Sequence, residues 1–237
     1  MTPNPSKAPW YFVGLQELLV YFDPWIAGVM IPGLIIAGLM AVPYLDPNPM
    51  GIGAYSLRKR PFANVLFLLG IAMWFILIFI GYYCRGPNYG WYWPWESWLV
   101  HKPLPPPMPS LSVWVGGLLL AAYLGFGILG PRLIQREIPW KKAIPGFFLA
   151  VVVFGGAGIL LEALTPGRLA WLVFFLFVYF FFGFLMPQRY IRSLPWPRYL
   201  VTMLLVLLTV GVLLKMGVRL GFNVKYIFTL PEYNFNI

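Results

Sequence analysis

The sequence predicts an all-α integral membrane protein with about six transmembrane helices. Of its 237 residues, 60% are hydrophobic and only 10% are charged, and the mean hydropathy is +0.77. A soluble domain carries about 25% charged residues and could not bury this much apolar surface. A bilayer removes that difficulty, because lipid tails solvate the apolar faces of the helices.

Long uncharged runs between charged residues indicate where the spans lie. A helix needs about 20 residues to cross roughly 30 Å of hydrocarbon, and each run is close to that length. We expect the spans within Asp23–Asp46, Arg60–Arg85, Lys102–Arg132 (from about Ser110 onward), Lys142–Glu162, Arg168–Arg189 and Arg198 to about Gly217. Lys215, near the end of the sixth span, is expected to extend its amine toward the membrane surface.

The positive charges predict how these helices are oriented. Three short loops on one side hold ten of the 17 Lys and Arg residues, namely Arg58, Lys59, Arg60, Arg132, Arg136, Lys141, Lys142, Arg189, Arg192 and Arg198. Short loops rich in Lys and Arg remain in the cytoplasm. Both termini are therefore expected on the positive (periplasmic) side of a bacterial-type inner (plasma) membrane, in a multi-pass arrangement.

Composition also excludes several classes of function. The formal net charge of +10 fits contact with anionic lipid, and no basic run is interleaved with aromatic residues as in single-strand nucleic-acid binding. One cysteine, Cys84, and one histidine, His101, are present. This chain alone therefore cannot form a disulfide, a b-type haem site with two histidine ligands or a His/Cys metal site. Residues 1–10 lack the apolar region of a cleavable signal peptide.

The stretch from Gly86 to Pro109 is crowded with Trp and Tyr and ends in prolines. An aromatic belt at the membrane surface explains it most simply; a docking surface for a partner domain is the alternative.

Glu162 is expected to lie on a proton path or to pair with Arg168. Cys84 is expected to be a buried, inert thiol rather than a point of covalent haem attachment.

The order of motifs in the first hundred residues is informative. Ala8–Tyr11 (Ala-Pro-Trp-Tyr) leads through Phe22–Pro24 into the first span, which ends at Val42–Tyr44, and the basic turn Arg58–Phe62 opens the second. This order, from Lys7 to Gly90, resembles the C-terminal part of cytochrome b and subunit IV of cytochrome bf complexes. In that family a Pro-Glu-Trp-Tyr loop covers the quinol-oxidation pocket on the positive side.

The resemblance implies a non-haem subunit of a bc-type quinol–cytochrome c oxidoreductase, inactive alone. Pro9, Trp10, Tyr11 and Phe12 would form one wall of a quinol pocket shared with another chain, since a quinone ring suits an apolar slot. The family's loop glutamate is missing, because Pro-Glu aligns with Ala8–Pro9. Glu17 is then the nearest carboxylate and the candidate proton acceptor; otherwise it is an interfacial residue near a helix start.

The resemblance also implies partners and cofactors outside this chain. Haem b would be held by a haem-binding cytochrome b subunit and the iron–sulfur cluster by a Rieske-type protein, with a c-type cytochrome as acceptor. His101 would be structural or would meet the Rieske-type partner. Residues 1–100 form the cytochrome b-like region and residues 101–237 an additional four-helix region of unknown role. The rival functions are a transporter or channel component and a structural membrane anchor of a redox complex.

Overall fold

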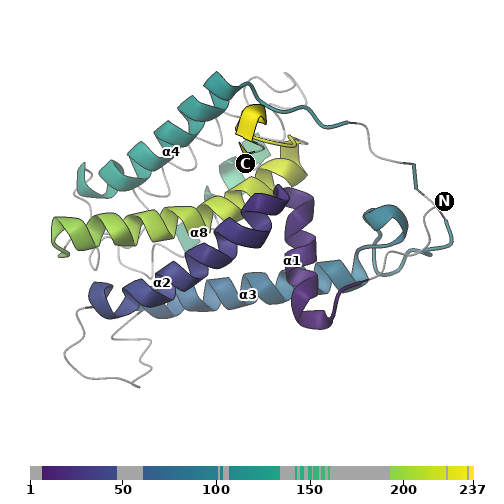
Figure 1. Ribbon diagram of the computed structural model, residues 1–237, viewed down its shortest axis with the longest axis horizontal. Helices are drawn as coiled ribbons and strands as arrows, with labels where there is room; N and C mark the ends of the chain where they lie inside the picture. The colour runs from purple at the N-terminus through teal and green to yellow at the C-terminus, as the bar shows by residue number, and fades with distance from the viewer. Residues whose placement is uncertain are drawn as a thin grey trace.

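The computed structural model describes residues 7–46, 61–100, 102–103, 107–133, 193–222, 224–233 and 235–237, with scattered positions between 142 and 160 (Figure 1). The predictions for His101 and Glu162, the fifth expected span and most of the basic loop residues lie outside these residues. The part of the chain described is mostly helical, as the sequence predicts.

Five long or medium helices form this part of the structure. Four of them correspond to expected spans, and the helix over Trp10–Tyr21 precedes these spans and contains Glu17. The five helices are α1 (Trp10–Tyr21), α2 (Ile31–Leu45), α3 (Pro61–Tyr83), α4 (Val113–Leu133) and α8 (Trp196–Phe222). A π-helical turn, Ile26–Met30, runs directly into α2. Short 3-10 turns cover Pro87–Tyr89 and Pro231–Tyr233, and the strands β1 (Thr229–Leu230) and β2 (Phe235–Asn236) pair antiparallel.

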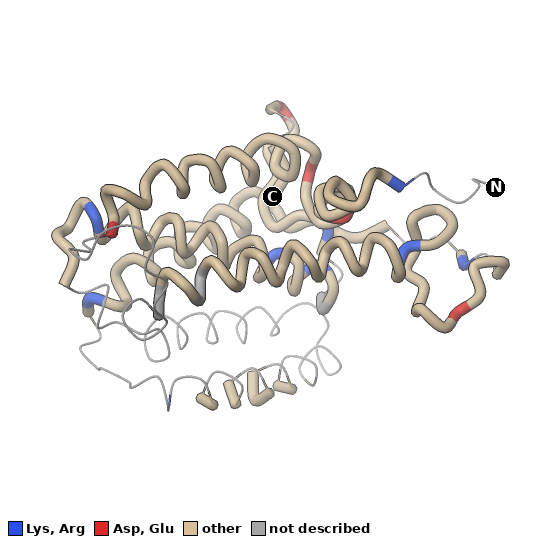
Figure 2. The backbone as a smooth tube through the Cα atoms, turned by 90° about the horizontal axis from the view of Figure 1, so that it is seen from below, with Lys and Arg blue, Asp and Glu red and all other residues tan. Residues whose placement is uncertain are grey.

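Among the described residues, three helical stretches are long and apolar enough to cross a membrane: Ile26–Leu45, Val113–Leu133 and Trp196–Leu220. They match the first, third and sixth expected spans. The second expected span corresponds to α3, a helix of 23 residues. Charged residues gather toward the two ends of these helices and leave long uncharged stretches between them (Figure 2). A membrane protein is therefore supported by helix length, composition and the placement of charge.

Helix α1 differs from the others in length and direction. Its 12 residues span about 18 Å at 1.5 Å per residue, too short to cross a bilayer. It runs across the long axis of the bundle, whereas α2, α3, α4 and α8 run broadly along it (Figure 1). This short helix lies at one end of the bundle (Figure 1).

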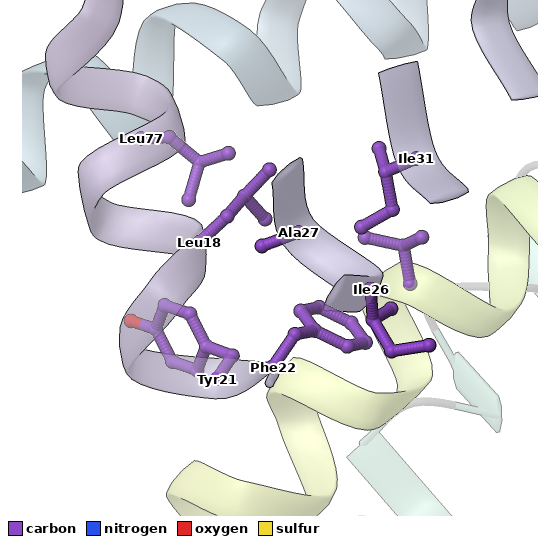
Figure 3. Close-up of a cluster of buried hydrophobic side chains, with 8 residues drawn as sticks. Leu18, Tyr21, Phe22, Ile26, Ala27, Ile31 and Leu77 are labelled. Atoms are coloured by element: carbon purple, nitrogen blue, oxygen red, sulfur yellow. The ribbon is translucent and has the colours of Figure 1, made fainter. Parts of the chain in front are cut away.

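Two glycines let α1 and α3 approach closely. A Cβ atom added at Gly81 of α3 would lie 2.3 Å from Cγ1 of Val13, and one at Gly14 would lie 3.2 Å from the Trp74 ring. Small residues at such crossings are typical of helix contacts in membranes. Next to this crossing, a buried apolar cluster joins α1, the π-helical turn, α2, α3 and α8 (Figure 3). Its members are Leu18, Tyr21, Phe22, Ile26, Ala27, Ile31, Leu77 and Val212.

The C-terminal segment closes the same end of the bundle. The backbone N–H of Lys225 donates to the carbonyl of Pro109, and that of Leu111 donates to Tyr226, which ties the segment to the start of α4. The Asn236 side chain donates to Asp23 at 3.1 Å, just before the first span. Lys215 is buried beneath this segment: its Nζ donates at 2.6 Å to the carbonyl of Lys225, a residue beyond the end of α8.

Candidate functional site

Glu17 lies at the centre of the candidate site and is fully buried. The Arg85 guanidinium binds it with two hydrogen bonds, Nη2 to Oε1 at 2.6 Å and Nε to Oε2 at 2.9 Å. The Tyr21 hydroxyl also donates to Oε1, at 2.9 Å. Paired, two-point arginine–carboxylate contacts are the strongest ion pairs in proteins. The ion pair therefore ties α1 to the residue two positions after the end of α3.

The sequence places these side chains by helical spacing. On α1, Val13, Glu17 and Tyr21 are four residues apart and share one face, and all three are buried. That face packs on α3, so a carboxylate on it needs a partner from α3 or from the turn that follows. Arg85 supplies it from a position just beyond the apolar part of the helix.

The turn after α3 holds Arg85 from the other side. The N–H of Tyr92 donates to the carbonyl of Cys84, and an isolated antiparallel bridge joins Arg85 to Trp91. The guanidinium carbon lies 5.4 Å from the ring centroids of both Tyr89 and Trp91, within cation–π range. Its Nη1 donates to the Tyr89 carbonyl at 3.3 Å. Arg85 is thus enclosed by aromatic rings, a carbonyl and a carboxylate.

Tyr89 occupies an unusual backbone conformation. Its φ is 55°, and that of the preceding Asn88 is 58°, the left-handed region that L residues other than glycine seldom adopt. Such strain costs about 1–3 kcal/mol per residue and persists where the surroundings hold it in place. Here the Arg85 side chain and the flanking bridge hold the turn, so the ion pair and the strained turn support each other.

The electrostatics agree with a charged pair. Burial alone would lower the pKa of Arg85, but the hydrogen bonds and the charge of Glu17 outweigh it and raise that pKa. Burial, followed by the Glu17 charge, raises the pKa of Tyr21, and the same causes raise the pKa of Tyr89 to about 12. Both phenols are therefore neutral at physiological pH, and only the carboxylate and the guanidinium carry charge.

The predicted quinol-contact residues lie on a different face of α1. Trp10, Tyr11 and Phe12 are 60%, 46% and 48% exposed. Their rings contact one another, with centroids 5.7 Å apart for Trp10–Tyr11 and 4.5 Å for Tyr11–Phe12. Pro9 immediately precedes the helix, and its carbonyl accepts the N–H of Phe12 at 2.8 Å. The structure thus gathers the four residues into an aromatic surface and gives Glu17 a separate, buried environment.

This geometry limits the chemistry that Glu17 can perform. Both of its oxygens accept hydrogen bonds from Arg85, and Oε1 also accepts one from Tyr21. A carboxylate has about four lone-pair sites, so a proton added to Glu17 competes with this ion pair without being blocked by it. The aromatic surface offers flat apolar area with the Tyr11 hydroxyl as its polar group, which suits a planar ring ligand held between two chains. Within the described ranges, no group of three or more His, Cys, Asp or Glu side chains comes together as a metal site would require.

Sequence reasoning did not single out Arg85, Tyr21 or Tyr89. Two signals in the sequence indicate the ion pair: Glu17 and Arg85 are isolated opposite charges, and both lie on the expected positive side. Cys84, beside Arg85, is buried, and burial raises the pKa of its thiol, which favours the inert role over a reactive one.

Comparison of the chain with protein-family models, with curated proteins and with solved structures gave no match.

Proposed function

We propose that this chain is a non-haem membrane subunit of a bc-type quinol–cytochrome c oxidoreductase, with six transmembrane helices and both termini on the periplasmic side of a bacterial-type inner membrane. The order of motifs from Lys7 to Gly90 supports the family, and the ten Lys and Arg residues in three short loops support the orientation. A haem-binding cytochrome b, a Rieske-type iron–sulfur protein and a c-type cytochrome complete the complex and carry its redox centres.

The observation that carries the proposal is the aromatic surface of α1. Trp10, Tyr11 and Phe12 stand exposed at one end of a membrane bundle, on a helix that lies across the bundle axis (Figure 1). Exposed aromatic rings at the end of a membrane bundle contact lipid headgroups or a partner chain, and the order of motifs from Lys7 to Gly90 favours the partner chain. In this proposal they and Pro9 form one wall of the quinol-oxidation pocket, and the cytochrome b subunit forms the other.

Glu17 has two roles in this proposal, one structural and one in proton transfer. Its ion pair with Arg85 fixes the helix that presents the aromatic wall. If it also accepts a proton from quinol, it does so at the expense of that ion pair, because a protonated carboxyl group no longer carries the charge that Arg85 binds. The same ion pair also favours a second candidate function, a structural anchor for a redox complex without quinol contact, because a carboxylate bound on both oxygens is well suited to holding two helices together.

Purification from the native membrane in mild detergent tests the assignment to a complex. We expect haem b and an iron–sulfur protein to copurify with the tagged chain, seen as a reduced-minus-oxidised haem spectrum and an iron–sulfur signal in electron paramagnetic resonance. An intact preparation that keeps its partners but contains neither centre would contradict the proposal.

Substitutions in that complex separate the quinol subunit from the structural anchor. Tyr11→Ala should raise the KM for quinol and lower the turnover of cytochrome c reduction. Leu19→Ala is the matched control, because Leu19 is similarly exposed on the same helix, at 47%, but lies outside the aromatic surface. If both variants form a complex of normal composition and reduce cytochrome c at equal rates, the quinol role is contradicted and the structural-anchor function remains.

A further inference from the structure

Lys215 is a buried charge without an ionic partner. It is 2% exposed and lies in the last third of α8. Its amine donates to the Lys225 carbonyl at 2.6 Å, and in the described part of the chain no carboxylate forms an ion pair with it. A neutral carbonyl compensates a buried ammonium only in part, so a nearby anion would stabilise the charged form of Lys215.

Two further cations lie close to Lys215. Arg219 is one helical turn further along α8, on the same face, and its charge acts on Lys215. Its guanidinium forms no hydrogen bond or ion pair with the described residues. Lys225, in the segment after α8, is exposed. Like charges one turn apart repel each other, which adds to the need for an anion.

Two of the three cations lie over one aromatic ring, and the third interacts with it electrostatically. The Nζ atoms of Lys215 and Lys225 lie 5.8 Å and 5.2 Å from the ring centroid of Tyr226, and Arg219 interacts electrostatically with the same tyrosine. Asp23, the carboxylate whose charge reaches Tyr226, is already engaged by the Asn236 side chain and by the backbone N–H of Trp25. Glu17, which is paired with Arg85, acts on Arg219 from a distance, and Asp23 acts on Tyr226. In the described part of the chain neither carboxylate forms an ion pair with the three cations.

The depth of this cluster identifies the anion. It lies at the end of a membrane-spanning stretch, Trp196–Leu220, where the headgroups of lipids meet the protein, and Lys and Arg at that depth bind anionic lipid. We propose that Lys215, Arg219 and Lys225 form a binding site for the phosphate of an acidic phospholipid. Arg219 and Lys225 contact the phosphate directly, and Lys215 contributes its charge from behind the Lys225 carbonyl.

Thermal unfolding of the purified full-length chain tests this site. Dodecyl maltoside micelles containing phosphatidylglycerol should raise the Tm of the wild-type chain above its value in micelles containing phosphatidylcholine. The double variant Arg219→Gln/Lys225→Gln should bind phosphatidylglycerol about tenfold or more weakly, measured by native mass spectrometry, because two charge-assisted contacts are lost. Arg198→Gln is the matched control: it removes the same charge from the opposite end of α8 and should keep the lipid effect.

Lys215→Met separates lipid binding from a folding defect. Methionine fills a similar volume without charge, so this variant should be at least as stable as wild type in phosphatidylcholine and should gain less from phosphatidylglycerol. A loss of stability that is equal in both lipids would overturn the place of Lys215 in the site.

Three results would overturn the site itself. The first is equal stabilisation of the wild-type chain by the two lipids, and the second is an undiminished effect in the double variant. The third is an equal rise in Tm with inorganic phosphate at the same concentration, which would assign the cluster to a free anion instead of a lipid.

Discussion

The two main helix contacts of this protein are built in different ways. The contact of α1 with α3 buries an ion pair, Glu17–Arg85, at the end of the bundle. The contact of α4 with α8 has no charge at its centre: the hydroxyls of Tyr123 and Tyr199 donate to the carbonyls of Leu207 and Ile128 on the facing helix. Both contacts are close at a glycine, Gly81 in the first and Gly127 in the second.

The two contacts differ in how precisely they fix the position of one helix along the other. Backbone carbonyls recur along every helix, so a tyrosine that slides by one turn can still find an acceptor, and packing decides the register. A buried carboxylate has one suitable partner, and leaving it unpaired is costly. The ion pair therefore fixes a short helix in a single position at the membrane end, while the α4–α8 contact distributes its stability over many apolar side chains.

The largest expected effect is from Arg85→Met. It leaves the Glu17 carboxylate buried and unpaired, which costs about 3–5 kcal/mol, and α1 should detach from α3. The measurement is the free energy of unfolding in detergent, together with the rate of proteolysis within residues 7–22. Lys102→Met is the control, because Lys102 pairs with Glu96 at the exposed surface. Equal losses for the two variants would contradict the difference drawn here.

Glycine-to-alanine substitutions sharpen the comparison. A Cβ at Gly81 meets Val13 Cγ1 at 2.3 Å and one at Gly127 meets Leu207 Cδ2 at 2.2 Å, so each should cost about 1–3 kcal/mol. Gly81→Ala should cost more, because valine is held in one rotamer on a helix, whereas leucine can turn its terminal methyls aside. The midpoint of thermal unfolding measures both losses. Gly70→Ala, with nothing within 4 Å, should be neutral or stabilising.

A smaller effect is expected from the tyrosines of the α4–α8 contact. Tyr123→Phe and Tyr199→Phe each remove one hydrogen bond to a carbonyl and keep the ring, at a cost of about 0.5–1.5 kcal/mol, near the lower end inside a membrane. Denaturant titration of each variant gives the value. A loss as large as that of Arg85→Met would show that the two contacts do not differ in kind.

The smallest effect is a pH dependence above the physiological range. The pKa of Tyr89 is about 12 in the folded chain and about 10 when unfolded. A group whose pKa is raised by folding contributes stability that is complete below pH 10 and is lost as the pH rises toward 12. In the Tyr89→Phe variant the Tm should decrease less steeply between pH 10 and 12 than in the wild-type chain. An unchanged slope would contradict this role of Tyr89. Tyr21 and Tyr226, whose pKa values are also raised, contribute to the remaining fall in Tm.

The membrane helices were predictable from the sequence because charge alone bounds them. Ile26–Leu45 contains no charged residue, and Val113–Leu133 and Trp196–Leu220 carry their Lys and Arg residues only toward their ends, since charge is too costly inside a bilayer to occur there often. Helix α1 was harder to predict: it is short and apolar on both faces, so periodicity does not distinguish it from a loop. The burial of Lys215 was not predictable, because the residues after α8 fold back over its end and supply a carbonyl to the Lys215 amine.

The candidate site was predicted only in part. The aromatic residues and Glu17 were identified by their order along the chain, which a resemblance can recognise. Arg85, the partner of Glu17, is 68 residues away, and local spacing cannot reveal such a pair. The position of Tyr89 depends on a turn between Gly86 and Gly90 in which Asn88 and Tyr89 adopt a left-handed conformation. Two glycines in the sequence do not indicate that the residues between them adopt this conformation.

A double-mutant cycle on Glu17 and Arg85 tests the central claim most directly, namely that one buried ion pair fixes α1 on α3. The variants are Glu17→Leu, Arg85→Met and the double variant, and the quantity is the free energy of unfolding in one detergent. We predict that each single variant loses several kcal/mol and that the double variant loses much less than their sum. Additive losses would show that the two side chains act independently and would contradict this account.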